Sequence, residues 1–154
     1  MAKHVFSALC SKSIIDRETN QLSLINVPEG IEISPISESE YKDNTIPISG
    51  GGQYVMELVC LWRRSDFSVS EKGHARLVVK SPSGEKVSEV DIPINLETSA
   101  QSRNIIKFPA FSFKGPGTYI YVLQQQKGTE KKPRWITVAE IPFGITFSQK
   151  QPSD

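Results

Sequence analysis

The sequence predicts an all-β fold, an antiparallel β-sandwich of about eight strands with little or no helix. Apolar and polar side chains alternate over short runs, which is the pattern of strands with one buried face. The 10 glycines and 10 prolines of the 154 residues are spread between these runs, and turn signals recur every ~8–12 residues as in sandwiches. No stretch keeps apolar residues at i, i+3, i+4 and i+7 for long enough to form a substantial helix.

The segment 108–126 gives the clearest signature of this fold. Aromatic residues lead into a Gly-Pro-Gly turn, in which Gly115 and Gly117 can take positive φ without steric cost. The strand 118–126 that follows is apolar on both faces, so we expect it to be central in a sheet. Each buried tyrosine hydroxyl needs a partner, such as a backbone carbonyl at a sandwich corner. One face of this strand carries Tyr119, Tyr121 and Leu123.

The N-terminal part predicts a hairpin. Residues 4–11 and 22–27 alternate as strands, and the segment 14–20 between them holds Asp16 and Asn20, which favour a turn. Residues 34–53 are the least strand-like, because they combine prolines, Ser-Glu repeats and three consecutive glycines. A loop this long in a compact domain is usually either functional or mobile.

The remaining strands follow in order. We expect an edge strand at 86–96, because Pro93 removes a backbone donor. In the last strand, Gly144 indicates a bulge or a close neighbour. Further strands are expected at a short edge around Ile46 and Ile48, at 54–64 with Tyr54, Met56, Leu58, Cys60 and Trp62 facing the core, at 74–80, at 103–113 with a bend at Pro109, and at 134–147.

Several of these residues resemble a known family. The segment Ala8-Leu9-Cys10 through Ile15-Asp16, the strand 19–27, the tip Pro82-Ser83-Gly84 and the run from Phe113 to Tyr119 are similar to a family of small uncharacterised bacterial β-sandwich proteins, a domain of unknown function. The resemblance covers most of the chain, and its motifs are turn and core residues. It implies a β-sandwich and no activity. The chain departs from the family at its 34–53 loop and its basic 127–134 loop.

Length and charge limit the classes of protein to which the chain can belong. A chain of 154 residues predicts one domain, here 1–147, with a frayed polar tail at 148–154. Net charge is +1, from 18 basic and 17 acidic side chains, which argues against nucleic acid as the main partner. No apolar run approaches the ~20 residues needed to cross a bilayer, and the N-terminus does not resemble a signal peptide. We therefore expect a cytoplasmic protein.

No chemistry-bearing cluster is present in the sequence. His4 and His74, the only histidines, lie far from any cysteine, so no metal site is expected. Cys10 and Cys60 lie inside apolar runs, either as free buried thiols or as a disulfide between the sheets. Glu57 is interpreted as facing solvent. The sequence predicts no enzyme, no catalytic residue and no cofactor.

Two surface features carry the functional hypotheses. Lys127, Lys131, Lys132 and Arg134 flank Trp135, either as a small anion-binding patch or as a charged tip that keeps an edge soluble. A mixed outward face holds Val55, Val59, Leu61, Ile120, Val122, Ile136 and Val138, which would need a cover if these strands were neighbours. We expect a non-enzymatic interaction module that binds a protein partner or itself through a sheet face or edge. The alternative is a small-molecule or glycan-binding sandwich that uses Trp62, Trp135 or the long loop.

Overall fold

The computed structural model describes residues 1–33, 46–47, 56–108, 112–113, 115–128 and 132–147. Within these residues every regular element is a strand. The predictions for Tyr54, Val55, Pro109, Lys131, the tail 148–154 and most of the 34–53 loop lie outside the described residues. The strands are β1 (Lys3–Cys10), β2 (Lys12–Ile15), β3 (Leu22–Ile25), β4 (Gly30–Ile33), β5 (Ile46–Pro47), β6 (Met56–Arg63), β7 (Glu71–Lys80), β8 (Lys86–Leu96), β9 (Gln101–Phe108), β10 (Ser112–Phe113), β11 (Gly117–Lys127) and β12 (Arg134–Phe147).

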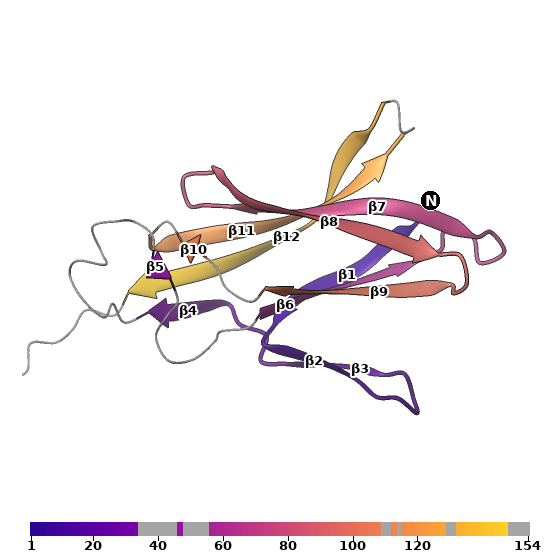
Figure 1. The fold of residues 1–154 in the computed structure, drawn as a ribbon, viewed down its shortest axis with the longest axis horizontal. Coiled ribbons are helices and arrows are strands. Elements are labelled where there is room, and N and C mark those ends of the chain that lie inside the picture. The colour runs from indigo at the N-terminus through magenta and orange to yellow at the C-terminus, as the bar shows by residue number, and fades with distance from the viewer. Residues whose placement is uncertain (34–45, 48–55, 109–111, 114, 129–131, 148–154) are drawn as a thin grey trace, which may run out of the picture.

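Two sheets form the sandwich (Figure 1). The five-stranded sheet has the order β4-β12-β11-β7-β8, and the three-stranded sheet has the order β1-β6-β9. All neighbouring pairs in the two sheets are antiparallel except β4 and β12, which run parallel. The all-β sandwich predicted from the sequence is confirmed, and its two sheets together hold eight of the described strands.

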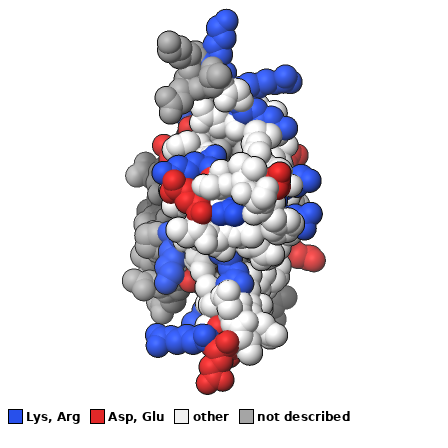
Figure 2. Space-filling view, turned by 90° about the vertical axis from the view of Figure 1, so that its right-hand side faces the viewer, with Lys and Arg blue, Asp and Glu red and all other residues white. Residues whose placement is uncertain are grey.

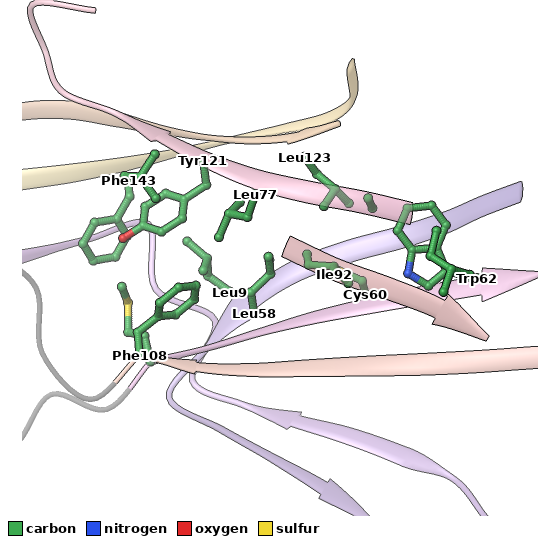
Figure 3. Packing of buried hydrophobic residues seen from close by; sticks show 14 of the residues in the cluster. Leu9, Leu58, Cys60, Trp62, Leu77, Ile92, Phe108, Tyr121, Leu123 and Phe143 are labelled. Carbon is green, nitrogen blue, oxygen red and sulfur yellow. The ribbon is translucent and has the colours of Figure 1, made fainter. Parts of the chain in front are cut away.

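The core lies between the two sheets (Figure 3). Trp62 packs at one end, and an aromatic group of Phe108, Tyr121 and Phe143 packs near the other. The Tyr121 ring meets Phe108 and Phe143 edge to face, with centroids 6.2 and 6.1 Å apart. Such pairs add about 0.5–1.5 kcal/mol each beyond the area that they bury. The core face predicted for residues 56–62 is confirmed, since Met56, Leu58, Cys60 and Trp62 all belong to the cluster.

The central strand and its turn are also confirmed. β11 lies between β12 and β7. Gly115 and Gly117 have φ values of 99° and 131°, and a Cβ on Gly117 would lie 2.6 Å from Cγ of Pro82. The hydroxyl of Tyr119 donates to the carbonyl oxygen of Gly115 at 3.0 Å. A turn of the predicted kind therefore fixes the corner and satisfies a buried phenol.

The two remaining backbone predictions hold as well. β8 is an edge of the five-stranded sheet, and the Pro93 carbonyl accepts a hydrogen bond from Asn104 Nδ2 at 3.0 Å. This bond ties the edge to β9 in the other sheet. Gly144 has the close neighbour that the sequence predicts, because a Cβ on Gly30 of β4 would lie 2.4 Å from the Gly144 oxygen.

The N-terminal hairpin prediction is wrong in its pairing. β1 pairs with β6 inside the sandwich, and the hairpin forms between β2 and β3, in a region where a turn was expected. The chain changes course at Ser11, whose N–H donates to the carbonyls of Ile25 and Asn26 at 3.1 and 3.0 Å. The alternation of side chains in β1 and β3 is compatible both with the predicted hairpin and with the observed pairing. β1 pairs with the longer strand β6 because this pairing buries Leu9 in the core.

Candidate functional site

The hairpin β2–β3 lies outside the two layers of the sandwich, next to the three-stranded sheet (Figure 1). Its turn is built by Asp16, whose Oδ1 accepts bonds from the N–H groups of Glu18 and Thr19 at 2.9 and 2.7 Å and from the Thr19 hydroxyl at 2.8 Å. These bonds, those from Thr19 first, lower the pKa of the Asp16 carboxyl. Asn20 closes the turn with a φ of 55°, a conformation that asparagine tolerates. The turn residues named from the sequence are therefore in place.

One attachment of the hairpin to the sheet passes through Glu57 of β6. Its Oε2 accepts hydrogen bonds from the Ser13 N–H, at 2.7 Å, and from the Ser13 hydroxyl, and Lys107 Nζ lies 3.7 Å from Oε1. Burial opposes ionisation of the Glu57 carboxyl, but the Ser13 hydrogen bonds and the Lys107 charge outweigh it and lower its pKa. The solvent-facing interpretation of Glu57 is wrong, because the residue is only 6% exposed. The hairpin covers it and supplies the donors.

A second attachment lies at the hairpin tip. Arg103 of β9 donates from Nη1 to Asn20 Oδ1 at 2.8 Å and from Nη2 to the Asn20 carbonyl at 2.7 Å. A cleft of about 430 Å³ lies between the tip and the start of β9. Its lining is Ile15, Asn20, Ser99, Ala100, Gln101 and Arg103. Sequence analysis missed this contact, since no local signal links residues 83 positions apart.

The outer strand of the hairpin, β3, presents an unpaired backbone edge. Asp16 N–H donates to the Gln21 carbonyl at 2.9 Å, so the antiparallel alternation turns the backbone groups of Ser23 toward β2 and those of Leu22 and Leu24 away from it. Among the described residues these outward groups meet no backbone partner. On the opposite edge of the hairpin, the N–H of Ser13 is taken by Glu57.

Exposed aliphatic side chains occur on the hairpin that carries this edge. On the hairpin, Ile14 and Ile25 lie with Ser23 on the face turned away from the side chain of Ser13. Single exposed aliphatics are ordinary on proteins, but three of these, Ile14, Ile15 and Ile25, belong to the two strands of one hairpin. The exposed large aliphatics of the N-terminal region are Val5 at 46%, Ile14 at 43%, Ile15 at 40%, Ile25 at 38% and Val27 at 59%.

The mixed outward face expected from the sequence does not form one surface. Val59 and Leu61 belong to the three-stranded sheet, whereas Ile120 and Val122 belong to the five-stranded sheet. Val59 is fully buried on the side of its sheet away from the core cluster, and Val122 is 2% exposed. Neither valine therefore needs a partner subunit to cover it.

The two tryptophans have distinct environments. Trp62, one of the three ligand contacts that the small-molecule hypothesis offered, is fully buried in the core and cannot touch a ligand. Trp135 is half-buried, and the guanidinium of Arg76 lies 4.3 Å from the centre of its ring. Arg76 also donates to Gln124 at 2.8 Å and pairs with Glu89 at 3.2 Å. Acidic and basic side chains are interspersed on the face shown in Figure 2.

The two cysteines are free and lie in separate environments. Cys10 lies opposite Glu57 in the β1–β6 register, and burial, followed by the Glu57 charge, raises its pKa. Cys60 belongs to the core cluster, where burial raises its pKa to about 11. Ser7 lies opposite Cys60 and hydrogen-bonds to His4 Nε2 at 2.7 Å. At neutral pH a thiol with this pKa stays protonated, so Cys60 is not an activated nucleophile.

Two kinds of feature are absent from the described part of the chain. No group of three or more His, Cys, Asp or Glu side chains is arranged to hold a metal ion there. No helix long and apolar enough to span a membrane occurs there either.

Comparison with known proteins gives a structural relationship only. No protein-family model and no curated protein matches the chain. Among solved structures, the crystal structure of the C-terminal domain of wzt is similar, with a TM-score of 0.52 and 11% sequence identity, covering 99% of this chain and 77% of that chain. At this identity the likeness shows the fold alone.

Proposed function

We propose that the protein is a non-enzymatic interaction module that associates with a second copy of itself through the free edge of β3. The observation that carries the proposal is an unpaired strand edge on a hairpin whose strands carry the exposed side chains Ile14, Ile15 and Ile25. An exposed strand edge is a template on which another strand can pair. The partner strand would extend the hairpin into a larger sheet.

The register of such a pairing follows from the hairpin. Leu22 and Leu24 present the outward backbone groups, so a two-fold antiparallel arrangement bonds Leu22 of one copy to Leu24 of the second copy. Ser23 then faces Ser23 of the second copy at the symmetry axis, without a backbone bond between them. In this arrangement each outward N–H and C=O of β3 gains a partner.

The side chains are compatible with this symmetric pairing. A two-fold axis brings a strand against its own sequence, so any charge near the axis would meet a like charge. No residue from 19 to 27 is charged. Strand edges usually carry lysine, other charges or proline that prevent such pairing, and none of these occurs from residue 19 to residue 27.

Sedimentation velocity over a wide concentration range tests the proposal. We expect the natural protein to form a dimer and Ser23→Lys to weaken association by about tenfold or more, because two ammonium groups would meet at the axis. Ser23 is exposed and its backbone bonds run to β2, so the substitution leaves the hairpin intact. Asn95→Lys on the edge strand β8 is the matched control and should dimerise normally.

Either of two results would overturn the proposal. One is a monomer for the natural protein up to millimolar concentration. The other is equal association of Ser23→Lys and the natural protein, with unchanged far-ultraviolet circular dichroism for both. An open-ended polymer would exclude the two-fold arrangement, because a closed symmetric pair uses both copies of the edge.

A further inference from the structure

The cleft at the hairpin tip is separate from the edge of β3 and has its own chemistry. Its volume of about 430 Å³ falls in the range of roughly 300–1,000 Å³ found for small-molecule sites. The walls come from two chain segments, the hairpin turn and the start of β9, which Arg103 joins through Asn20. The guanidinium therefore lines the cleft at the point where its two walls meet.

The charge of Arg103 is not neutralised within the described residues. Both of its hydrogen bonds run to Asn20, whose amide and carbonyl oxygens are neutral acceptors. The ion pairs of the described residues do not include Arg103. No acidic residue lines the cleft, and Asp16 in the neighbouring turn is occupied by Glu18 and Thr19. Arg103 is therefore the one charged residue among those that line the cleft.

The guanidinium also keeps unused donors. Arginine has five N–H groups in a planar fork, and the two bonds to Asn20 leave the others available. A carboxylate matches this fork, because its two oxygens can accept parallel bonds. A single cation suits a monoanion better than a phosphate dianion.

The other lining residues define the remainder of the ligand. Ser99 and Gln101 contribute polar side chains, and their segment is held by a bond from the Gln101 N–H to Ser99 Oγ at 3.3 Å. Ile15, 40% exposed, and Ala100 contribute small apolar surfaces. This mixture fits a compact molecule with hydroxyl groups and a short carbon skeleton.

We infer that the cleft between the hairpin tip and β9 binds a small hydroxylated organic carboxylate, with Arg103 holding its carboxylate group. The site does not depend on the pairing of β3. Ligand binding and self-association therefore fail independently, and Ser23→Lys should bind the carboxylate as the natural protein does.

Two-dimensional amide NMR titration with glucuronate and glucose tests this inference. The two probes have similar size and hydroxyl content, but only glucuronate carries a carboxylate. We expect saturable shifts at Asn20, Gln101 and Arg103 with glucuronate and at least about tenfold weaker binding of glucose, since glucose lacks the bidentate partner of the guanidinium.

Substitutions separate the ligand contact from the structural bond to Asn20. Arg103→Lys keeps the charge but loses the fork, and should weaken glucuronate binding about tenfold. Ala100→Phe fills the cleft, leaves the Arg103 bonds in place and should abolish binding. Arg134→Gln removes an exposed charge from β12 in the other sheet, outside the cleft lining, and should bind normally.

Three results would overturn the inference. They are the absence of saturable shifts with glucuronate, equal binding of glucose, and unchanged binding in Ala100→Phe. Tighter binding of inorganic phosphate than of glucuronate would exclude the carboxylate assignment. A circular dichroism spectrum like that of the natural protein is required of each variant, and Ala100→Phe decides the outcome if Arg103→Lys loosens the hairpin.

Discussion

The strand edges β3 and β8 illustrate two ways in which a β-protein exposes backbone. β8 is long and carries Lys86, Glu89, Asp91 and Pro93 along its length, and its Pro93 carbonyl is bonded to Asn104. β3 is four residues long, lacks charge, and has outward backbone groups with no backbone partner among the described residues. Charges, proline and cross-sheet bonds prevent edge-to-edge pairing. β3 lacks these blocking features, and this difference is the reason for proposing β3, and not β8, as the edge that pairs.

The two edges also differ in how they are anchored. Every second residue of β8 from Ile92 to Leu96 is buried in the core. The hairpin that carries β3 is held by Glu57 and Arg103 through side-chain hydrogen bonds, and its own aliphatics are half-buried or exposed. Regions with few buried apolar contacts open at lower free energy than the core. The open edge therefore lies on the less firmly anchored element.

The largest expected effect on stability comes from truncating a buried core side chain. Ile94→Ala on β8 should lower the free energy of unfolding by about 2–5 kcal/mol, because it removes buried methylene groups and leaves a cavity. Ile14→Ala on the hairpin should change it by less than about 0.5 kcal/mol, because Ile14 is 43% exposed. Urea denaturation measures both. Equal losses would show that the hairpin is part of the cooperative core.

A smaller effect is expected at the Glu57 attachment. Glu57→Gln keeps an acceptor for Ser13 but removes the charge, which should cost about 1 kcal/mol, the difference between charged and neutral acceptors. The loss should be local, with faster hydrogen exchange at the Ser13 amide and unchanged exchange in β8. Val69→Thr, at an exposed residue of the β6–β7 connection, provides a control that should leave both rates unchanged. Uniform loss of protection in both regions would contradict a local attachment.

The same carboxyl predicts a pH dependence. Glu57 has a folded-state pKa below its ordinary value of 4.5, so its stabilising contribution is present above that value. The contribution disappears as pH falls through the lowered pKa, because the protonated carboxyl accepts the Ser13 hydrogen bonds less strongly and no longer attracts Lys107. The free energy of unfolding, measured by urea denaturation at several pH values from 7 to 3, should therefore fall less steeply for Glu57→Gln than for the natural protein. If the free energies of unfolding of the two proteins fall in parallel with pH, the acid sensitivity comes from other groups.

The smallest effect is expected when one charge is removed from β8. Asp91→Asn should change association by less than about twofold, since Lys86, Glu89 and Pro93 still block that edge. Sedimentation velocity at the concentrations used for Ser23→Lys makes the comparison direct. Clear association through β8 in this variant would mean that one charge alone had kept that edge closed.

Much of the sandwich could be predicted from residue patterns. Alternation identified the core face of β6, and Pro93 identified β8 as an edge. Alternation did not identify the partners of β1 and β3, because a strand with one apolar face can pair in more than one way. It also gave the wrong environment for Glu57, since the residues that cover this carboxyl come from a hairpin 44 positions earlier in the chain.

The candidate site shows the same division. The uncharged run 19–27 was visible in the sequence, but that it forms an open edge depends on β1 leaving it to pair with β6. The cleft required contact between Arg103 and Asn20, which are distant in the chain. The sequence by itself determined most of the long strands, the core face of β6 and the glycine turn at 115–117, because these follow from the local period and from backbone sterics. Only the tertiary structure decided strand partners, the burial of Glu57 and the cleft, because these depend on which distant segments pack together.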